Sequence, residues 1–448
     1  MAAPESTSRL FRAIIAGGSI VGLTMALALD RADIDYVLLE TGEVAPDLGA
    51  SVSMHAHTQR VMEQLAVWPE IDAAVVPVTD REHYDEHGWL FEKSAILQEI
   101  SKMCLGRQTS FMARRFWLQC LYNQIRDKNK VRAHTGLVSF VETADDVTVT
   151  TTGGEIITGD VLIGADGIHS TVRQQLADEA AAAGKEAAAT AMRSGFVSKY
   201  QCIFATAKND EPQQFLLPGM VHNVYYRGFS GVISAGVPGF AFWFLFVKSD
   251  QASRTPDTPR FSDADVEAVI DRYGHHAVGP GYTFRDLWQA TTKAAMLPLE
   301  EGVLATAWRS PGGRVVLAGD AVHKATINPG LGANLGVEGV VHLANLLVPL
   351  VRRVAVEPDD RNCHTRPTRL QLADVFSAYE KLQRPHADLV VSMSSYLTRF
   401  EAMETWWLRL LRRLSPWISD RTKASKFAGY VREGPWLSYL PNPDDERR

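Results

Sequence analysis

The sequence predicts an α/β fold of two or three domains, with a βαβ opening, a β-rich middle and a helical C-terminal region. Three observations predict it. First, 448 residues exceed what one hydrophobic core usually holds. Second, apolar runs at 11–16 and 36–39 flank a glycine-rich turn and an apolar helical stretch at 23–29, as in two parallel strands joined by a helix. Third, strand patterns fill most of 131–247, and the segment after residue 330 is mostly helical.

In the middle of the chain, alternating apolar and polar residues and glycine turns predict β-strands. Val147, Val149 and Thr151 alternate with threonines before a Gly153-Gly154 turn, so residues 131–164 are expected to form a β-meander ending in a buried strand. Further strands are predicted at 200–207, 223–227, 231–235, 240–247 and 314–317. An alanine-rich segment, 180–191, is either a poorly specified helix or a flexible connector. A helix is expected to begin after Ser262, with Asp265 as its capping partner.

Composition and charge exclude several classes. Lys plus Arg is 46 and Asp plus Glu is 52, so the formal charge of −6 gives no global signal for a nucleic-acid partner. The four cysteines share no short spacing, which argues against a zinc or CxxC site, and we expect reduced thiols and no metal. The N-terminus has no apolar signal core and no stretch is long enough to cross a bilayer, so a cytoplasmic protein is expected, with 340–351 as a buried helix.

The first motif is the turn Gly17-Gly18-Ser19-Ile20-Val21-Gly22. Gly17 would allow a sharp exit from the strand, and Gly22 would let the helix pack closely on it. The free amides at the helix start favour a pyrophosphate. Ser19 replaces the middle glycine of the G-x-G-x-x-G pattern, although its amide can still donate and its hydroxyl can add a bond.

Glu40 closes the second strand a little over twenty residues after Gly17. A carboxylate at this place accepts bonds from a ribose diol and repels a 2′-phosphate, so it suits the adenosine diphosphate of FAD or NAD. The alternative is a solvated strand end, and Glu40 alone does not distinguish them.

Two later elements have the same strand-to-turn character. Asp166-Gly167 follows a buried strand, and Gly319-Asp320 follows another. Residues 329–334 then open an apolar helix, whose free amides near Gly332 and Ala333 can stabilise negative charge in a ligand. Each element alone could be an ordinary turn, but their order in one chain argues for a ligand site.

Together with the arginine of Phe111-Met112-Ala113-Arg114-Arg115, these motifs resemble the single-component FAD-dependent monooxygenases of the aromatic-hydroxylase type. The resemblance covers roughly residues 11–440. Finer features resemble the fungal branch that epoxidises prenylated intermediates of meroterpenoid and indole-diterpene biosynthesis, namely Gly49-Ala50-Ser51, residues 240–247 and residues 437–443.

The resemblance implies a role for each matching residue. The residues that would contact FAD are Gly17, Gly18, Ser19, Gly22, Gly49 and Ala50. Glu40 would bind the adenosine ribose of FAD. Arg114 would lie near the pyrophosphate, with Arg115 as the adjacent alternative. Asp166 and Gly167 would support FAD and the nicotinamide cofactor, Asp320 would bind the ribityl chain, and Gly332 and Ala333 would approach the isoalloxazine. The chain departs from the family where proline is usual seven residues after the aspartate: Ile327 stands there, and Pro329 comes two later.

The resemblance also implies a discontinuous, Rossmann-like FAD-binding domain at 9–75, 107–180 and 305–350. A β-rich substrate domain would be interleaved with it at 76–106 and 190–304, and residues 351–448 would form the C-terminal helical region.

The implied chemistry is oxidation of NADPH or NADH with transfer of one atom of O₂ to an electron-rich substrate, most simply a prenylated phenol. We expect epoxidation of a prenyl alkene, because no acid–base pair for a phenol is evident in the sequence. Ring hydroxylation, an FAD oxidase or dehydrogenase without oxygen insertion, and a dinucleotide-fold protein that has lost flavin are the alternatives. His323 is expected to be structural.

Substrate-side residues are expected from the β-rich middle. Tyr225 and Tyr226 are successive strand residues, so one faces the core and the other the opposite side, and either is a candidate for bonding a substrate oxygen, against a packed strand aromatic. The basic, amphipathic segment 406–414 is either a covering helix or a contact with a membrane surface.

Overall fold

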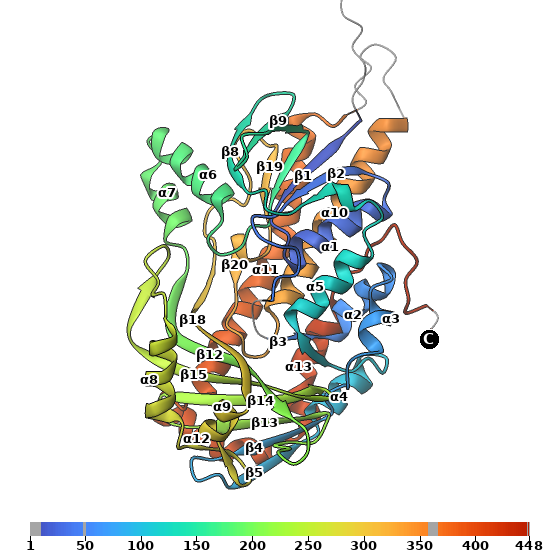
Figure 1. The fold of residues 1–448 in the computed structure, drawn as a ribbon. Helices are drawn as coiled ribbons and strands as arrows, with labels where there is room; N and C mark the ends of the chain where they lie inside the picture. Colours follow the sequence, from blue (N-terminus) through green and yellow to red (C-terminus); the bar gives the residue numbers. More distant parts are fainter. Residues whose placement is uncertain (1–9, 48–50, 357–365, 446, 448) are drawn as a thin grey trace, which may run out of the picture.

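The computed structural model describes residues 10–47, 51–356, 366–445 and 447. Two sheets lie at opposite ends of an elongated molecule, and the long helix α11 (Arg369–Glu401) runs between them (Figure 1). Such an arrangement leaves room for a site where the two sheets approach each other.

The first sheet is parallel and has the order β19-β11-β1-β2-β7. Its strands are β1 (Arg12–Ala16), β2 (Asp35–Leu39), β7 (Val131–Arg132), β11 (Val161–Gly164) and β19 (Val315–Leu317). Helix α1 (Ile20–Arg31) connects β1 to β2 and packs on α10 (Gly332–Val356). The predicted βαβ opening is therefore confirmed, and β1 is buried along four of its five residues, as expected for a strand covered on both faces.

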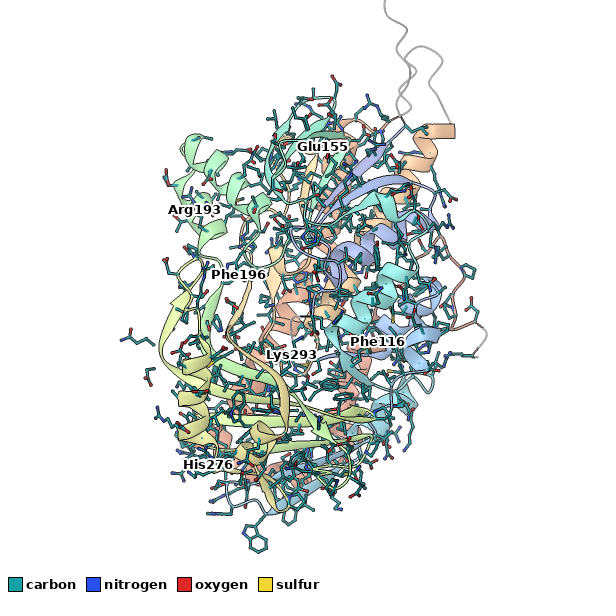
Figure 2. The ribbon with its side chains drawn as sticks, viewed as in Figure 1. Phe116, Glu155, Arg193, Phe196, His276 and Lys293 are labelled. Atoms are coloured by element: carbon teal, nitrogen blue, oxygen red, sulfur yellow. The ribbon has the colours of Figure 1, made fainter. Side chains whose placement is uncertain are left out.

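The predicted β-meander is a small antiparallel sheet, β10-β9-β8, that contacts the first sheet through β1. Its strands are β8 (Leu137–Glu142), β9 (Val147–Thr151) and β10 (Ile156–Gly159). After β11 the alanine-rich segment is helical, not a flexible connector: it forms the end of α6 (Thr171–Ala182) and most of α7 (Glu186–Arg193). Phe196 follows α7 (Figure 2) and is fully buried, and the Arg173 guanidinium lies 5.0 Å from its ring centroid. This contact holds the chain in place where it leads into the second sheet.

The second sheet has eight strands in the order β20-β18-β12-β15-β14-β13-β4-β5. Their bounds are β4 (Asp80–Tyr84), β5 (Leu90–Ser94), β12 (Val197–Asn209), β13 (Met220–Tyr225), β14 (Phe229–Val237), β15 (Gly239–Arg254), β18 (Thr291–Val303) and β20 (His323–Lys324). The four strands expected between 200 and 247 are all present and are antiparallel neighbours, with β12 paired to β15, β15 to β14 and β14 to β13. The short pair β3 (Ser51–Met54) and β6 (Ser110–Ala113) forms a separate two-stranded sheet, which contacts β12 and β14 of the second sheet.

The C-terminal region is helical, as expected. Helix α11 packs on α10 and on β18, and α13 (Asp420–Glu433) packs on α2 (Ala56–Gln64) and α4 (Ile96–Met103). Between them, α12 (Trp406–Leu414) lies beside the β4–β5 end of the second sheet (Figure 1), where Arg412 contacts Glu86 at 3.8 Å.

Smaller expectations also have outcomes. Helix α8 (Asp263–Tyr273) begins at a full capping box between Ser262 and Asp265, as predicted. The described cysteines, Cys104, Cys120 and Cys202, are free and buried. The expectation that no stretch is long enough to cross a membrane is wrong by length and composition: within the described residues, Gly332–Arg353 of α10 is long and apolar enough. This stretch includes the predicted buried helix at 340–351, and 78% of its apolar window is buried inside the protein.

Candidate active site

The first motif forms a tight strand-to-helix turn. Gly17 has φ +104°, a conformation that disfavours a side chain, and a Cβ on Gly22 would lie 1.8 Å from the Gly17 carbonyl oxygen. Helix α1 therefore begins directly against β1, with Ser19 as its N-cap residue. The Ser19 side chain makes no capping bond, so the first amides of α1 are available to a ligand.

Glu40 closes β2 beside this turn. Its two carboxylate oxygens accept hydrogen bonds from the amides of Gly18 (2.5 Å) and Gly42 (2.8 Å). A carboxylate has about four acceptor positions, so two remain. Glu40 lines a cavity of about 360 Å³, here called the outer cavity, together with Ser19, Asp166 and Arg114.

Asp166 brings an unsatisfied oxygen to the outer cavity. Its Oδ2 accepts from the amide of Val172 near the start of α6 (3.1 Å), whereas its Oδ1 is buried without a hydrogen-bond partner. Burial raises the pKa of Asp166, although hydrogen bonds from Ser170 and nearby amides oppose the shift. A buried oxygen without a partner is unfavourable, so this position fits a ligand that donates a hydrogen bond.

Arg114 begins α5 (Arg114–Asn123) and lines both the outer cavity and the next one. Within the described residues it makes no hydrogen bond or ion pair, and burial lowers its pKa, an effect that Asp320 and Glu40 oppose. Arg115 points elsewhere: it is exposed and lies 3.4 Å from Asp47. Of the two neighbours, Arg114 is the one that can meet an anionic ligand.

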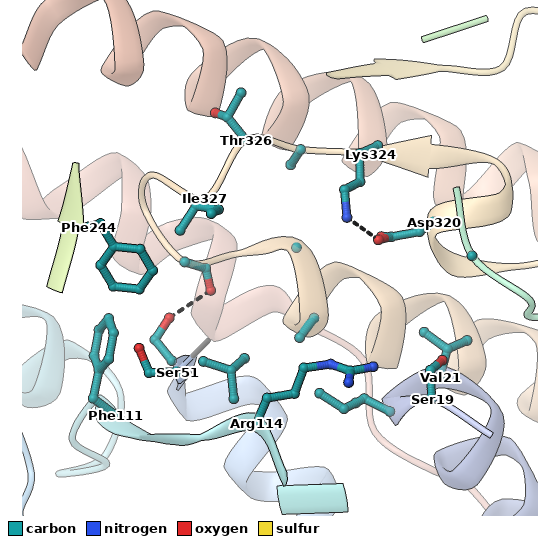
Figure 3. Close-up of a pocket in the computed structure, with 18 of the residues that line it drawn as sticks. Ser19, Val21, Ser51, Phe111, Arg114, Phe244, Asp320, Lys324, Thr326 and Ile327 are labelled. Carbon is teal, nitrogen blue, oxygen red and sulfur yellow. Dashed lines mark hydrogen bonds and ion pairs between the residues drawn. The ribbon is translucent and has the colours of Figure 1, made fainter. Parts of the chain in front are cut away.

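The central cavity, about 300 Å³, shares Ser19, Arg114, Ala165 and Gly167 with the outer cavity. In Figure 3, Arg114, Asp320 and Lys324 lie toward its Ser19 end, and Lys324 and Asp320 form an ion pair. Burial disfavours the Lys324 ammonium, yet the Asp320 carboxylate raises its pKa overall. Gly332 and Ala333, the first residues of α10, also line the cavity, so the positive end of this helix dipole faces it.

At the opposite end of the central cavity, Phe111 and Phe244 face each other below Ile327 (Figure 3). These three side chains also line a smaller inner cavity of about 80 Å³, which continues between the second sheet and α11. Its wall is largely apolar and contains Val78, Leu97, Val221, Val232, Phe246 and Leu397. The three cavities are therefore joined in succession. Charged side chains and free amides line the outer cavity and one end of the central cavity, and mostly apolar side chains line the inner cavity.

A buried carboxylate interrupts this apolar wall. Glu401, the last residue of α11, is 1% exposed and lines the inner cavity. Burial raises its pKa to about 7, although Arg81 and Asn328 oppose the shift. Glu401 cannot be recognised from the sequence, because a glutamate in a helical segment is ordinarily a surface residue.

The structure brings together most of the predicted cofactor residues. The members that line the outer or the central cavity are Gly17, Ser19, Glu40, Arg114, Asp166, Gly167, Asp320, Gly332 and Ala333. Gly18 and Gly22 shape the turn, and Gly49 and Ala50 lie outside the described residues. His323 is fully buried against Trp308, with its pKa lowered to about 4 by burial, as a structural residue would be.

The two tyrosines lie elsewhere. The Tyr225 hydroxyl is 2.9 Å from His83 Nδ1, and the Tyr226 hydroxyl donates to the Ala277 carbonyl at 2.8 Å. Both side chains are buried and line none of the three cavities. Both tyrosines are thus packed in the way that was the alternative to a role in binding the substrate.

The departure at the proline position falls at the junction of two cavities. Ile327 lines both the central and the inner cavity, whereas Pro329 lines the inner one only. The loop remains tightly held, since Ser53 Oγ donates to the Gly330 carbonyl at 2.8 Å and His55 Nε2 lies 3.3 Å from the Pro329 carbonyl. A branched aliphatic side chain that lines both cavities therefore stands at the sequence position expected for proline.

Comparisons with known proteins agree with this geometry. A family model described as an FAD binding domain matches residues 11–357. The FAD-dependent monooxygenase penM of Penicillium crustosum is 30% identical over 434 residues, covering 97% of this chain and 88% of penM. The FAD-dependent monooxygenase ptmM of Penicillium ochrochloron is 31% identical over 443 residues, covering 96% of this chain and 99% of ptmM. The chain belongs to this family of FAD-dependent monooxygenases.

A solved structure shows the same fold. Klebsiella pneumoniae HpxO complexed with FAD and uric acid superposes with a TM-score of 0.74 at 18% identity, covering 96% of this chain and all of that one. The expected resemblance to fungal FAD-dependent monooxygenases and the expected fold are thus confirmed. The protein is a flavoprotein oxidoreductase with FAD as its cofactor.

Proposed function

We propose that this monooxygenase holds FAD along the outer and central cavities and uses NADPH or NADH, with O₂, to epoxidise the terminal alkene in the prenyl chain of an apolar substrate. The observation that carries the proposal is the line of three cavities, polar at one end and apolar at the other. The fungal relatives, which are named as FAD-dependent monooxygenases, support the reaction class.

The residues of the outer cavity fit the adenosine and pyrophosphate parts of FAD. The remaining acceptor positions of Glu40 suit a ribose diol, and Asp166 Oδ1 suits a further hydroxyl donor. The amides at the start of α1 and the unpaired Arg114 guanidinium suit the two phosphates. Among the residues that the structure describes, none is hydrogen-bonded to the Arg114 guanidinium and would have to be displaced by a ligand.

The central cavity fits the ribityl chain and the flavin ring. Asp320, held by Lys324, can accept from a ribityl hydroxyl. The amides and helix dipole at Gly332 and Ala333 favour negative charge on the ring edge that they face. When bound, FAD would supply the redox chemistry, in which the nicotinamide provides the reducing equivalents, one atom of O₂ goes to the substrate and the other leaves as water.

The inner cavity would bind the substrate and direct its alkene toward the central cavity. The two cavities meet at Phe111, Phe244 and Ile327, whose apolar side chains would exclude water from this junction. An isolated alkene needs no proton removed before it reacts, only a fixed position in a dry pocket. Walls of aromatic and aliphatic side chains suit such a group.

The test compares a farnesylated phenol with its analogue in which the terminal double bond is reduced, each incubated with the FAD-loaded enzyme, NADPH and O₂. Epoxidation predicts a product heavier by one oxygen atom from the unsaturated compound alone. Oxygenation of both at similar rates would place the reaction on the ring and contradict the proposal.

Ring hydroxylation is a second candidate, and Glu401 is the observation that favours it. Phenol hydroxylation benefits from a base that raises electron density in the ring, and a buried carboxyl with a pKa of about 7 can serve as one. The structure therefore removes one argument for epoxidation, the lack of a nearby acid–base group. The substrate pair above separates the two reactions, and oxidation of NADPH without oxygen incorporation would instead indicate an oxidase.

A further inference from the structure

A polar cluster closes the inner cavity at the end of α11. The Glu401 carboxylate accepts from Asn328 Nδ2 (2.5 Å) through one oxygen and from Asn223 Nδ2 (3.1 Å) through the other. The Arg81 guanidinium lies 3.7 Å away. These residues come from α11, β13, β4 and the loop after β20, so four separate elements converge on this carboxylate.

The partners of Glu401 are themselves fixed. The Asn223 Oδ1 accepts from Arg81 Nε at 2.7 Å, and the Asn328 Oδ1 accepts from Thr398 Oγ1 at 3.0 Å. Both asparagines are buried. The carboxylate is therefore held in one orientation before any substrate arrives, which is the condition for precise recognition of a polar group.

The position is unfavourable for a carboxylate. Burial penalises its charge, and the C-terminal end of a helix dipole is negative, so the charge is disfavoured twice. Of the three cavities, Glu401 lines the inner one alone, so it lies outside the proposed FAD site. Costly buried charges of this kind gather at sites that bind or react.

We propose that Glu401 is the substrate-anchoring residue of the inner cavity and accepts a hydrogen bond from a hydroxyl or N–H group on an otherwise apolar substrate. The proposal rests on the proposed function, because it takes the inner cavity as the substrate site. One accepted bond at each oxygen leaves further acceptor positions. The Arg81 guanidinium, which also lines this cavity, offsets the charge of the carboxylate, so a neutral hydrogen-bond donor is the chemistry that fits.

The anchor would also set position. Five residues, Ser53, Phe111, Phe244, Ile327 and Gly330, border both the inner and the central cavity. A substrate held by its donor group at Glu401 would thus extend its apolar part toward the flavin. Because a site built to bond a donor rejects an analogue that lacks it, Glu401 would determine specificity.

The test measures binding rather than turnover. The FAD-loaded, oxidised protein is titrated with a farnesylated phenol and with its O-methyl ether, and the flavin absorbance change gives each dissociation constant. We expect the parent to prefer the free phenol by about tenfold or more, the range of a hydrogen bond to a charged acceptor. Glu401→Leu should abolish this preference, and Glu401→Gln, which keeps the shape and a neutral acceptor, should reduce it.

Glu404→Gln is the matched control. This glutamate lies three residues beyond Glu401, pairs with Lys248 and lines none of the three cavities, so the preference should remain. An unchanged preference in Glu401→Gln and Glu401→Leu would overturn the anchor. If the preference is lost as expected but no oxygen reaches the alkene, the anchor stands and epoxidation fails. If neither compound binds to the parent, both proposals are contradicted.

A second, independent observation concerns the surface of α12. Its apolar side chains at 406, 410 and 414 lie one helical turn apart and are exposed, and Trp417 beyond the helix is 88% exposed. Only Leu408 of this helix is buried. The helix therefore presents an apolar stripe outward instead of covering the core with it, and large exposed stripes of this kind mark interaction surfaces.

We infer that α12 docks on an anionic phospholipid membrane. Tryptophan is favoured at the level of lipid headgroups, and Arg409 and Arg413 on the same short helix can meet anionic lipids. The opposite side of the helix packs against the protein, since Arg412 contacts Glu86 and its guanidinium lies 4.9 Å from the Phe91 ring centroid. Docking would bring the enzyme to the phase in which prenylated substrates dissolve.

Co-sedimentation tests this inference with vesicles of phosphatidylcholine alone and of phosphatidylcholine with phosphatidylserine. The parent should bind the second kind and lose binding as salt is raised, whereas Trp406→Ser with Trp417→Ser should remain in solution. Ile156→Ser, which replaces an equally exposed apolar residue on β10, is the control and should bind like the parent. Absence of vesicle binding, or self-association that the paired substitution abolishes, would overturn the inference.

Discussion

Arg114 gives a sharp test of how FAD is held. Its guanidinium lies between the outer and central cavities and has no hydrogen bond or ion pair within the part of the chain that the structure describes. Arg114→Ala should therefore remove a contact with the pyrophosphate and little else. No hydrogen bond of the apoprotein is lost, so its unfolding temperature should stay close to that of the parent.

The size of the effect follows from the type of bond. A hydrogen bond between charged groups contributes about 1.5–3 kcal/mol, and each 1.4 kcal/mol changes a dissociation constant about tenfold. Arg114→Ala should thus raise the dissociation constant for FAD by about 10-fold to 100-fold. Arg114→Lys keeps the charge without the planar fork and should fall in between.

The assay is titration of the apoprotein with FAD, followed by quenching of flavin fluorescence. Arg115→Ala is the matched control, because this neighbour is exposed and its contact with Asp47 is a surface pair worth about 0–1 kcal/mol. Parent-like affinity in Arg114→Ala, or equal weakening by both substitutions, would refute this placement of the pyrophosphate.

Three further predictions concern single carboxylates. Glu40→Ala should weaken FAD binding by about 1–3 kcal/mol, and flavin retained through dialysis as tightly as in the parent would remove Glu40 from the site. Asp320→Ala should lower flavin content and NADPH oxidation more than Arg115→Ala does; equal values in Asp320→Ala and the parent would contradict its placement. Glu401 has a pKa raised from 4.5 to about 7 in the fold, so its contribution to stability is complete below about pH 4.5 and is lost as the pH rises through 7. The loss amounts to at most about 3 kcal/mol. The free energy of unfolding in urea should therefore fall less between about pH 5 and about pH 8 for Glu401→Gln than for the parent. An equal fall in the two proteins would contradict the raised pKa of Glu401.

Features set by neighbouring residues could be predicted from the sequence. The first strand was expected at 11–16 and is Arg12–Ala16, because an apolar run before a glycine turn is a local signal. The capping box at Ser262 is local in the same way. Gly17, Glu40, Asp166 and Asp320 could be found from the sequence because they follow strands β1, β2, β11 and β19 of one parallel sheet, whose carboxyl ends meet at one edge.

Features set by long-range pairing could not be predicted. Strands β4 and β5 carry mostly polar residues without apolar alternation, and they join the second sheet only because β4 pairs with β13, far along the chain. Glu401 meets Asn223 across 178 positions and Asn328 across 73, and no spacing rule links such residues. Tyr225 and Tyr226 were chosen from a local pattern that was not sufficient. Strand alternation indicates that they point to opposite faces, but it does not reveal where the cavity lies.

The most direct test of the central claim is the position of the oxygen atom in the product. The FAD-loaded enzyme is incubated with NADPH, isotopically labelled O₂ and a farnesylated phenol, and the product is fragmented in a mass spectrometer. The cavities described above predict one labelled oxygen atom in an epoxide on the prenyl chain, with an unaltered ring. A labelled hydroxyl on the ring, or consumption of NADPH with no label in the product, would contradict it.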